Sequence, residues 1–422
     1  MHGTEVEFPN IRHLLAFKEV AIQKGISAAA FRVHRSQPAV TQAIAGLEQQ
    51  LDVILFDRQA AGMFLTPGGD AFFVRVCRMF DHLAHAAREA AQIEIRHRLR
   101  HKTHPKDHRP TADFHRNTTA AQLRALVAIG VTGSFSLAAR RTGLSQPSIH
   151  RAGRDLERLA GMAFFTTTRK GTKLTRAGEA FARGTRLARD ELRQGFDELN
   201  HLKGKDSTRI TVGSMPLSRS MVLPTATHRI LQEKSDVQIR NVDGPYGELL
   251  RALRHGELDF LIGALRDPPP EDDVIQEPLF SDPLAIVAGP DHPLAGRPHL
   301  TLRDTLNFPW IAPPRDTPTG DYLYRQLGIA RMEKTPVRIV SSSLIMVRGL
   351  LARGDYVTIL SQHQAAVEMR LGLIVPLDVT LPDSTRPIGL TYRADWVPTT
   401  TQTRFLSLIR LAAMTPGYPQ NE

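Results

Sequence analysis

One short stretch near the start of the chain carries the side chains needed to read nucleic acid. Ser36, Gln37, Pro38, Thr41 and Gln42 lie close together. Ser, Thr and Gln carry donors and acceptors that hydrogen-bond base edges or phosphate oxygens. The chemistry expected of this stretch is therefore contact with double-stranded DNA.

The same stretch occurs a second time, 145 − 36 = 109 residues later. Neighbouring landmarks keep this spacing without a gap. The matching segments are Ser36-Gln37-Pro38-Ala39-Val40 with Ser145-Gln146-Pro147-Ser148-Ile149, Leu47-Glu48 with Leu156-Glu157, and Leu65-Thr66 with Leu174-Thr175. A gapless match of this length indicates an internal duplication.

A supported helix is needed to present the polar side chains. Val40, Ile44, Leu47 and Leu51 are spaced to form one buried face of a helix that Ser36 caps. Two short helices are expected before it, a hairpin or wing over 56–66 after it, and then a long helix over 69–98. This order predicts a winged helix-turn-helix. A three-helix packing module with a polar surface is the alternative.

The two copies differ in the charge that they offer to DNA. The first has Arg58 and an uncharged wing, whereas the second has Thr167 in place of Arg58 and a basic wing. We expect both copies to touch DNA without being interchangeable readers. The DNA-contacting residues expected of the second copy are Ser145, Gln146, His150, Arg151, Arg154, Arg169, Lys170 and Lys173.

These residues resemble the LysR-type transcriptional regulators. In that family a Ser-Gln-Pro-Ala helix is followed by Leu-Glu, by Leu-Phe-x-Arg, and by Leu-Thr with a glycine shortly after. Here the pattern reads Ser36-Gln37-Pro38-Ala39, Leu47-Glu48, Leu55-Phe56-Asp57-Arg58, Leu65-Thr66 and Gly69. The resemblance implies a homo-oligomer, dimer or tetramer, that binds DNA and contacts RNA polymerase.

The resemblance also bears on the long helices. In relatives with one module, this linker helix pairs with that of a partner chain. Here two modules share one chain, and we expect the helices over 69–98 and 178–203 to pair within it as a covalent pseudo-dimer. Ordinary pairing between chains, with one module idle, is the alternative.

Charge is concentrated in the duplicated half. Residues 1–206 hold 32 Lys and Arg and 20 Asp and Glu, a net +12. The remainder holds 54 − 32 = 22 and 43 − 20 = 23, a net −1. A positive excess confined to one half is what phosphate binding requires. Binding to a membrane surface is disfavoured, because no helix is basic on one face and aromatic on the other.

Several kinds of site have little support in the sequence. Cys77 is the single cysteine, which excludes a disulfide framework and a thiolate metal site. His97/His101 and His104/His108 have a spacing that could hold a metal, but a solvated basic tether is the favoured interpretation. No metal and no cofactor are expected. No apolar run approaches the ~20 residues of a membrane span, so a cytoplasmic protein without membrane contact is expected.

From Thr208 the pattern changes to strands that alternate with helices. Strands are expected over 209–213, 237–242 and 258–262, and helices over 221–233 and 247–255. This βαβ order predicts parallel sheets flanked by helices. Leu253-x-x-Gly256-Glu257-Leu258-Asp259 and Leu350-Leu351-Ala352-Arg353-Gly354-Asp355 resemble the LysR effector domain, a two-lobed α/β fold (type 2) like a periplasmic binding protein. Residues 237–266 are similar to the subgroup of galactose-binding-protein regulators.

The fold implied by this resemblance places a ligand beyond the carboxyl ends of strands, near helix N-termini. The effector expected there is a small polar metabolite, a sugar or an organic acid. Serines that precede a helix are equally good N-caps, and the arginines can instead form surface ion pairs. The ligand-binding residues expected by position are Ser214, Met215, Leu217, Ser218, Arg266, Trp310, Arg315, Thr317, Ser341, Ser342 and Ser343.

The sequence thus predicts a multidomain protein that regulates transcription in response to a small molecule. An α/β enzyme fused to DNA-binding modules and a non-specific architectural DNA binder are the alternatives. Residues 207–415 show no nucleophile motif, Gly-rich phosphate loop or metal-ligand cluster, so no catalytic residue is expected. The expected divisions are 8–67 and 118–176 for the winged modules, 69–98 and 177–204 for the linker helices, 99–117 for the tether, 207–286 with 385–415 for effector lobe I, and 287–384 for lobe II.

Overall fold

The computed structural model describes residues 8–101, 110–169, 171–205, 208–329 and 336–414. The chain forms two compact units. The first comprises residues 1–208 with 255–257, and the second comprises residues 209–254 with 258–422. Most of the expected tether, including His104 and His108, lies outside the described residues.

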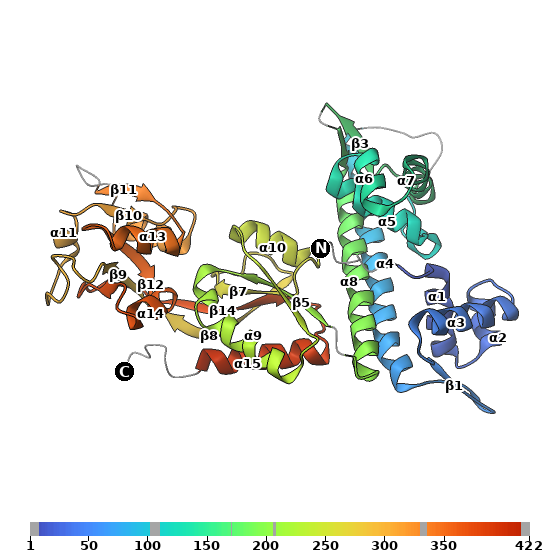
Figure 1. Ribbon diagram of the computed structural model, residues 1–422. Helices are drawn as coiled ribbons and strands as arrows, with labels where there is room; N and C mark the ends of the chain where they lie inside the picture. Colours follow the sequence, from blue (N-terminus) through green and yellow to red (C-terminus); the bar gives the residue numbers. More distant parts are fainter. Residues whose placement is uncertain (1–7, 102–109, 170, 206–207, 330–335, 415–422) are drawn as a thin grey trace. The chain divides into compact units, whose positions relative to one another are not determined.

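The first module is three helices and a hairpin (Figure 1). Ile11, Leu14 and Phe17 pack with Ile44 and Leu47 in its core. As predicted, the Ser36 hydroxyl caps the third helix by accepting a hydrogen bond from Ala39 N at 3.4 Å. The elements are α1 (Ile11–Gln23), α2 (Ile26–Arg32), α3 (Gln37–Leu51), β1 (Phe56–Gln59) and β2 (Gly62–Leu65).

The repeated motif residues tie the hairpin to its helices. Glu48 Oε1 accepts hydrogen bonds from the backbone amides of Leu55 at 2.8 Å and Phe56 at 3.3 Å. Thr66 Oγ1 donates to Ile54 O at 2.8 Å. A Cβ at Gly69 would lie 2.1 Å from Leu55 O, so only glycine lets the next helix pass this strand.

The second copy has the same elements in the same order. Glu157 Oε1 accepts from Phe164 N at 2.9 Å and Phe165 N at 3.0 Å, and a Cβ at Gly178 would lie 2.3 Å from Phe164 O. The motif therefore preserves this junction in both copies. The elements are α5 (Ala120–Thr132), α6 (Phe135–Thr142), α7 (Gln146–Ala160), β3 (Phe165–Thr168) and β4 (Gly171–Leu174), preceded by the short helix η1 (Phe114–Asn117).

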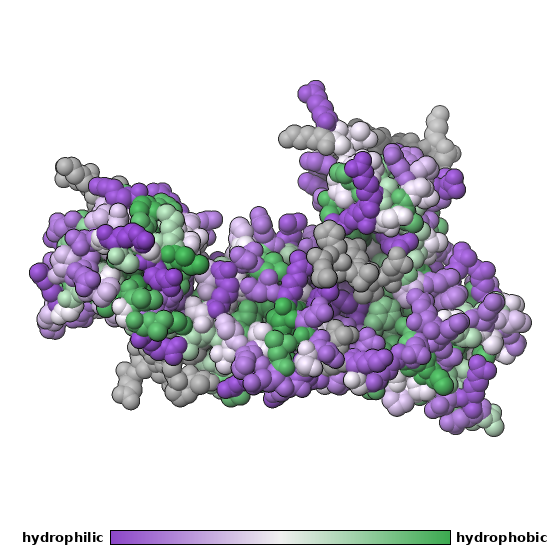
Figure 2. Space-filling model, viewed as in Figure 1, coloured by the Kyte–Doolittle hydropathy of each residue, from purple (hydrophilic) through white to green (hydrophobic). Residues whose placement is uncertain are grey.

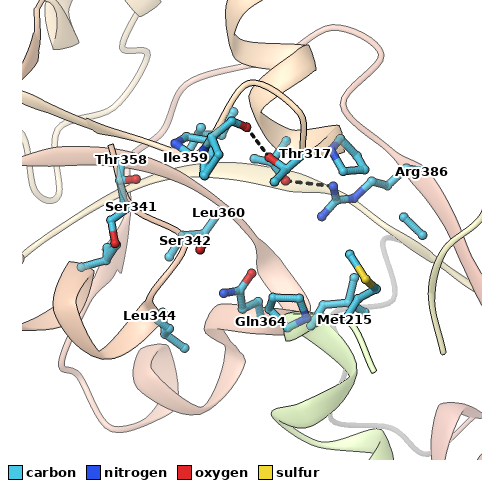
Figure 3. Close-up of a pocket in the computed structure, with 18 residues that line it drawn as sticks. Met215, Thr317, Ser341, Ser342, Leu344, Thr358, Ile359, Leu360, Gln364 and Arg386 are labelled. Carbon is cyan, nitrogen blue, oxygen red and sulfur yellow. Dashed lines mark hydrogen bonds between the residues drawn. The ribbon is translucent and has the colours of Figure 1, made fainter. Parts of the chain in front are cut away.

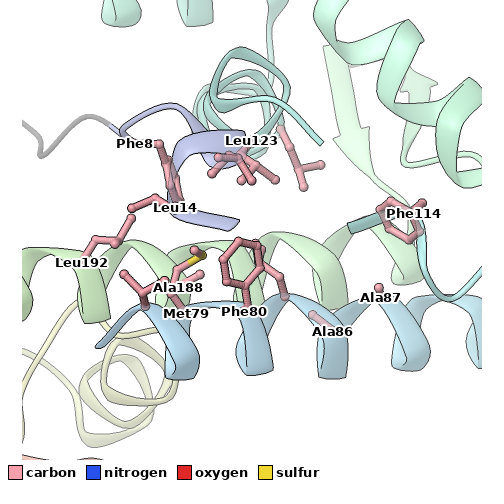
Figure 4. Close-up of a cluster of buried hydrophobic side chains, with 14 of the residues drawn as sticks. Phe8, Leu14, Met79, Phe80, Ala86, Ala87, Phe114, Leu123, Ala188 and Leu192 are labelled. Atoms are coloured by element: carbon pink, nitrogen blue, oxygen red, sulfur yellow. The ribbon is translucent and has the colours of Figure 1, made fainter. Parts of the chain in front are cut away.

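Two long helices, α4 (Pro67–His101) and α8 (Arg176–Leu202), lie side by side and antiparallel within this unit (Figure 1). Near the end of α4, Arg98 Nη2 donates to Gly161 O of the second module at 2.8 Å. Just beyond α8, Lys203 Nζ donates to Leu51 O of the first module at 2.7 Å. Apolar side chains of both helices join both modules in one core (Figure 4).

A buried ion network crosses the α4–α8 contact. Arg75 is 2% exposed and Glu191 is 2% exposed. Arg75 Nη1 donates to Glu191 Oε2 at 3.0 Å, and Arg78 Nε donates to Glu191 Oε1 at 2.8 Å. Burial by itself would raise the pKa of the Glu191 carboxyl. Hydrogen bonds from His82 and Arg78, with the charges of Arg78 and Arg75, outweigh burial and lower the pKa to about 2.

This shift predicts a loss of stability in acid. Because the folded pKa lies below the ordinary value of 4.5, the carboxylate stabilises the folded state above that value. The contribution of about 3 kcal/mol should decline as pH falls from about 5 to about 2. Thermal unfolding should show a pH-dependent difference between wild type and Glu191→Gln over this range. Glu179→Gln, an exposed carboxyl on α8, is the control; equal pH profiles for wild type and Glu191→Gln would contradict the assignment.

The second unit has two α/β lobes, each built on a five-stranded sheet. In lobe I the order is β6-β5-β7-β14-β8; β6, β5 and β7 are parallel, whereas β14 is antiparallel to both β7 and β8. Its elements are β5 (Arg209–Ser214), η2 (Pro216–Arg219), α9 (Val222–Glu233), β6 (Gln238–Val242), α10 (Tyr246–Arg254), β7 (Phe260–Ala264), β8 (Val274–Asp282), β14 (Arg386–Arg393) and α15 (Thr400–Met414).

Lobe II has the order β11-β10-β12-β9-β13, with β9 antiparallel to β12 and β13. The prediction of wholly parallel sheets was therefore wrong. The chain enters lobe II through β9 and returns through β14, and these passages add antiparallel strands to each sheet. The elements are β9 (Leu284–Ala288), α11 (Leu302–Thr305), β10 (Trp310–Ala312), α12 (Pro318–Asp321), η3 (Tyr322–Gln326), β11 (Val337–Val340), α13 (Leu344–Leu351), β12 (Val357–Ser361), α14 (Gln362–Arg370) and β13 (Val375–Pro376).

Among the described residues, no single helix is long and apolar enough to cross a membrane. Helices α5 and α6 meet such a criterion only as a pair bent by 120°. Their buried side chains, including Leu123, Leu126 and Ala138, belong to the core of the first unit.

Candidate nucleic-acid interface and effector cleft

Helix α3 presents a short polar surface. Gln37, Pro38 and Gln42 are exposed, and Ser36 is exposed as the N-cap. Thr41 is half-buried and its hydroxyl donates to Gln37 O at 3.0 Å, so it is engaged within the helix. The two glutamine amides are therefore the main hydrogen-bonding groups of this surface. Hydrophilic side chains cover most of the viewed face of α1–α3 (Figure 2).

Helix α7 presents a more basic surface. Gln146, His150, Arg151 and Arg154 are exposed, and Ser145 caps the helix by accepting from Ser148 N at 3.3 Å. The His150 ring packs on Phe135 of α6, with centroids 5.1 Å apart, and Arg154 Nη1 donates to Glu157 Oε2 at 2.8 Å. These contacts orient His150 and Arg154 without burying them.

The hairpins add further cations. Arg58 is exposed on β1, Arg169 is exposed just after β3, and Lys173 is exposed on β4. Lys170 lies outside the described residues. A wing beside a recognition helix is positioned to contact the phosphate backbone, where cations increase affinity without reading sequence. The second copy is therefore better equipped for phosphate contact than the first.

A cleft lies in the second unit between residues of lobe I and lobe II (Figure 3). Its volume is about 690 Å³ including the part open to solvent, within the range of small-molecule sites. Apolar side chains and prolines form most of the lining. Five of the predicted ligand-binding residues line it, namely Met215, Leu217, Thr317, Ser341 and Ser342.

The structure places three other predicted residues in structural roles, outside the cleft lining. Trp310 is fully buried in the core of lobe II, where its Nε1 donates to Thr305 O at 3.1 Å. Ser218 is buried and donates to Met215 O at 2.8 Å. Ser343 caps α13 by accepting from Met346 N at 3.3 Å. The N-cap alternative therefore accounts for Ser343.

The remaining three predicted residues also fall outside the lining. Ser214 is buried at the end of β5. The guanidinium of Arg266 lies 4.5 Å from the ring centroid of Tyr246, and that of Arg315 lies 4.4 Å from the ring centroid of Tyr324. Each arginine is thus stacked on an aromatic face, which holds it away from the cleft.

A different arginine, Arg386 at the start of β14, lines the cleft together with Thr319 and Gln364 (Figure 3). Its Nη1 donates to Thr319 Oγ1 at 2.8 Å, and its Nη2 donates to Asp282 Oδ2 at 3.2 Å. Local sequence offered no signal for Arg386, because it is 172 residues beyond Ser214 (386 − 214) and reaches the cleft only through the return strand.

Asp282 joins the two passages between the lobes. It is fully buried at the end of β8, and its Oδ1 accepts from the Ser361 hydroxyl at 2.7 Å and contacts His363 Nδ1 at 2.9 Å. Burial would raise the pKa of Asp282, but the hydrogen bond from His363 and the charge of Arg386 lower it. The carboxylate is therefore held ionised beside the cleft.

Ser361, His363 and Asp282 have the residue types of a hydrolase triad but a different geometry. The serine hydroxyl donates to the aspartate and makes no nucleophile–base contact with the histidine. None of the three lines the cleft. In the described residues, there is also no group of three or more His, Cys, Asp or Glu side chains that could hold a metal.

Comparison with known proteins agrees with this architecture. The description "Bacterial regulatory helix-turn-helix protein, lysR family" matches residues 11–70 and 120–179, and "LysR substrate binding domain" matches residues 203–413. The HTH-type transcriptional regulator GalR of Pseudomonas putida is 31% identical over 408 residues, which cover 96% of this chain and 98% of that protein. The chain belongs to the LysR family of transcriptional regulators.

Other members of the LysR family match a shorter part of the chain. The HTH-type transcriptional regulator PcaQ of Agrobacterium fabrum is 29% identical over 292 residues, covering 69% of this chain and 94% of that protein. Full-length OxyR from Pseudomonas aeruginosa has a similar fold, with a TM-score of 0.52 at 21% identity, covering 71% of this chain and 95% of that one.

The two kinds of DNA contact predict distinct mutant phenotypes. Gln37→Ala should weaken specific binding more than random binding, with a discrimination loss of about 1–3 kcal/mol per base contact. Lys173→Ala should weaken binding to all sequences and reduce the slope of log K against log salt by about 1. Binding titrations on operator and random duplexes at several salt concentrations measure both.

Gln49→Ala, at an exposed position near the other end of α3, is the matched control for Gln37. The assignment of Gln37 as a reader would be refuted by an equal loss of affinity on operator and random DNA.

Proposed function

We propose that this LysR-family protein is a sequence-specific transcriptional regulator whose DNA binding or promoter activity responds to a small-molecule effector. The observation that carries the proposal is the union, in one chain, of exposed polar recognition helices with a two-lobed, ligand-sized cleft. The uncharged surface of α3 disfavours a purely architectural binder, which would display more Lys and Arg there. The geometry of Ser361 and His363 disfavours the enzyme alternative.

We further propose that both winged modules read DNA, as a pseudo-dimer within one chain. Three observations support this: the helix-turn-helix description matches twice, the two modules repeat the same junctions, and α4 packs on α8. Two readers joined in this way fit half-sites separated by one turn of DNA, about 34 Å. The expected domain divisions, higher-order association and contact with RNA polymerase are part of the same proposal.

Disabling one module at a time tests the pseudo-dimer. Gln37→Ala with Arg58→Ala should remove hydroxyl-radical protection from one half-site, and Arg151→Ala with Arg169→Ala should remove it from the other. Each pair is exposed, so both proteins should keep the wild-type unfolding temperature. If the variant of the second module leaves the whole footprint and affinity unchanged, that module is idle and the pseudo-dimer proposal fails.

The cleft favours an organic acid with an apolar body over a sugar. Prolines and aliphatic side chains would leave most sugar hydroxyls without partners, which is costly in a desolvated site. Arg386 already donates to Asp282 and Thr319, and its terminal nitrogens retain N–H groups for a carboxylate. The hydroxyls of Thr317, Ser341 and Ser342 lie in the same lining and supply further donors.

A matched pair of ligands tests this effector class. An organic acid that binds should raise the unfolding temperature, and its primary amide should not. Arg386→Lys keeps the charge beside Asp282 but loses the planar fork, so affinity for the acid should fall roughly tenfold. Arg315→Lys, whose parent stacks on Tyr324, should bind the acid as wild type does. Equal stabilisation by amides or by sugars would contradict an organic-acid effector.

A further inference from the structure

The buried network at the α4–α8 contact separates charge by helix. Helix α4 contributes the cationic side chains Arg75 and Arg78, with His82 beside them, whereas α8 contributes Glu191 and Glu198. Arg75 Nε donates to Glu198 Oε2 at 3.0 Å, and His82 Nε2 lies 3.5 Å from Glu191 Oε1. Gln194 of α8 is fully buried and accepts from Arg75 Nη1 at 3.1 Å.

The internal repeat relates the two sides of this contact. With the 109-residue shift, His82 corresponds to Glu191 because 82 + 109 = 191. These two equivalent positions face each other across the antiparallel pair. In a contact between two like helices of the same geometry, each of these residues would therefore face its own counterpart.

Pairing α8 with a second α8 would leave its buried carboxylates without cations. The positions of Arg75 and Arg78 are occupied in the second copy by Gly184 and Leu187, since 75 + 109 = 184 and 78 + 109 = 187. Glu191 would then meet another Glu191. Two carboxylates that are buried together and lack cationic partners are strongly unfavourable.

Pairing α4 with a second α4 would bring basic side chains together and crowd the helices. Glu191 and Gln194 would be replaced by His82 and His85, which leaves Arg75 and Arg78 without the central carboxylate. Ala86 would take the place of Gly195, because 86 + 109 = 195. A Cβ at that position lies 3.0 Å from Phe72 Cδ2 and 3.2 Å from Arg75 Cβ, closer than ordinary packing.

We propose that α4 and α8 carry a charge and shape code that selects the linker helix of the opposite copy and rejects a like copy. The partner that fits the cationic face of α4 is the anionic face of α8, supplied by the same chain. The chain should therefore not exchange its DNA-binding modules with single-module members of the family. This inference rests on the proposed pseudo-dimer within one chain.

Selectivity accounts for this network better than stability does. A buried ion cluster is often no more stabilising than well-packed apolar side chains, because desolvation offsets the attraction between charges. Its energetic effect is large when one member meets the wrong partner, since an uncompensated buried charge results. Three charged side chains near the centre of the contact, Arg75, Arg78 and Glu191, therefore discriminate between partners.

Complementary charge reversals in the full-length chain test the code. One variant carries Glu191→Arg with Glu198→Arg, and the other carries Arg75→Glu with Arg78→Glu. Each should lower the unfolding temperature of the first unit by roughly 10 °C, because like charges meet in every α4–α8 pair within the chain. Co-expression should restore it and give a one-to-one mixed complex of differently tagged chains, since each α4 then finds an oppositely charged α8.

The chain with all four reversals should recover stability without a second chain, which also covers the case in which the separate variants do not fold. Arg183→Glu, which alters a partly exposed contact to Glu89, is the control and should change the unfolding temperature little. The code is overturned if the separate variants unfold as wild type does, or if neither co-expression nor the fourfold reversal restores stability. All readouts are taken without DNA, so a wild-type chain that binds no DNA would overturn the proposed function alone.

Discussion

The contact between α4 and α8 is the interaction on which the DNA-binding half depends. Each winged module buries its apolar side chains against the base of a long helix, and the two helices then bury theirs against each other. Small residues make this close approach possible: a Cβ at Gly184 would lie 2.2 Å from Ala86 Cβ. The spacing between the two readers is therefore set by helix packing and not by the tether between the copies.

The duplicated motif illustrates how a family pattern can report on architecture more than on chemistry. Glu48, Thr66 and Gly69 hold the hairpin and the linker helix in place, and the second copy repeats these ties with Glu157, Thr175 and Gly178. The side chains available to DNA lie between these fixed points and differ between copies. Duplication has thus preserved the junctions while the two exposed surfaces have diverged in charge.

The effector half follows a similar division between frame and surface. Asp282, held ionised by His363 and Arg386, joins the strands that pass between the lobes. Arg386 belongs both to this connection and to the cleft lining, so a ligand that contacts it also touches the connection between the lobes. A ligand changes the balance of conformations only through different affinities for them, and this arrangement gives such a difference a structural route.

The sequence by itself determined the duplication, the helix caps, the division into helical and α/β halves, and five residues of the cleft, because these follow from local spacing and from composition. Tertiary structure decided the rest. Arg386 reaches the cleft through a strand that returns from the other lobe, Arg266 and Arg315 are held by aromatic rings, and Arg75 meets Glu191 across 116 residues. Contacts between segments so distant in sequence leave no local pattern, because packing alone brings them together.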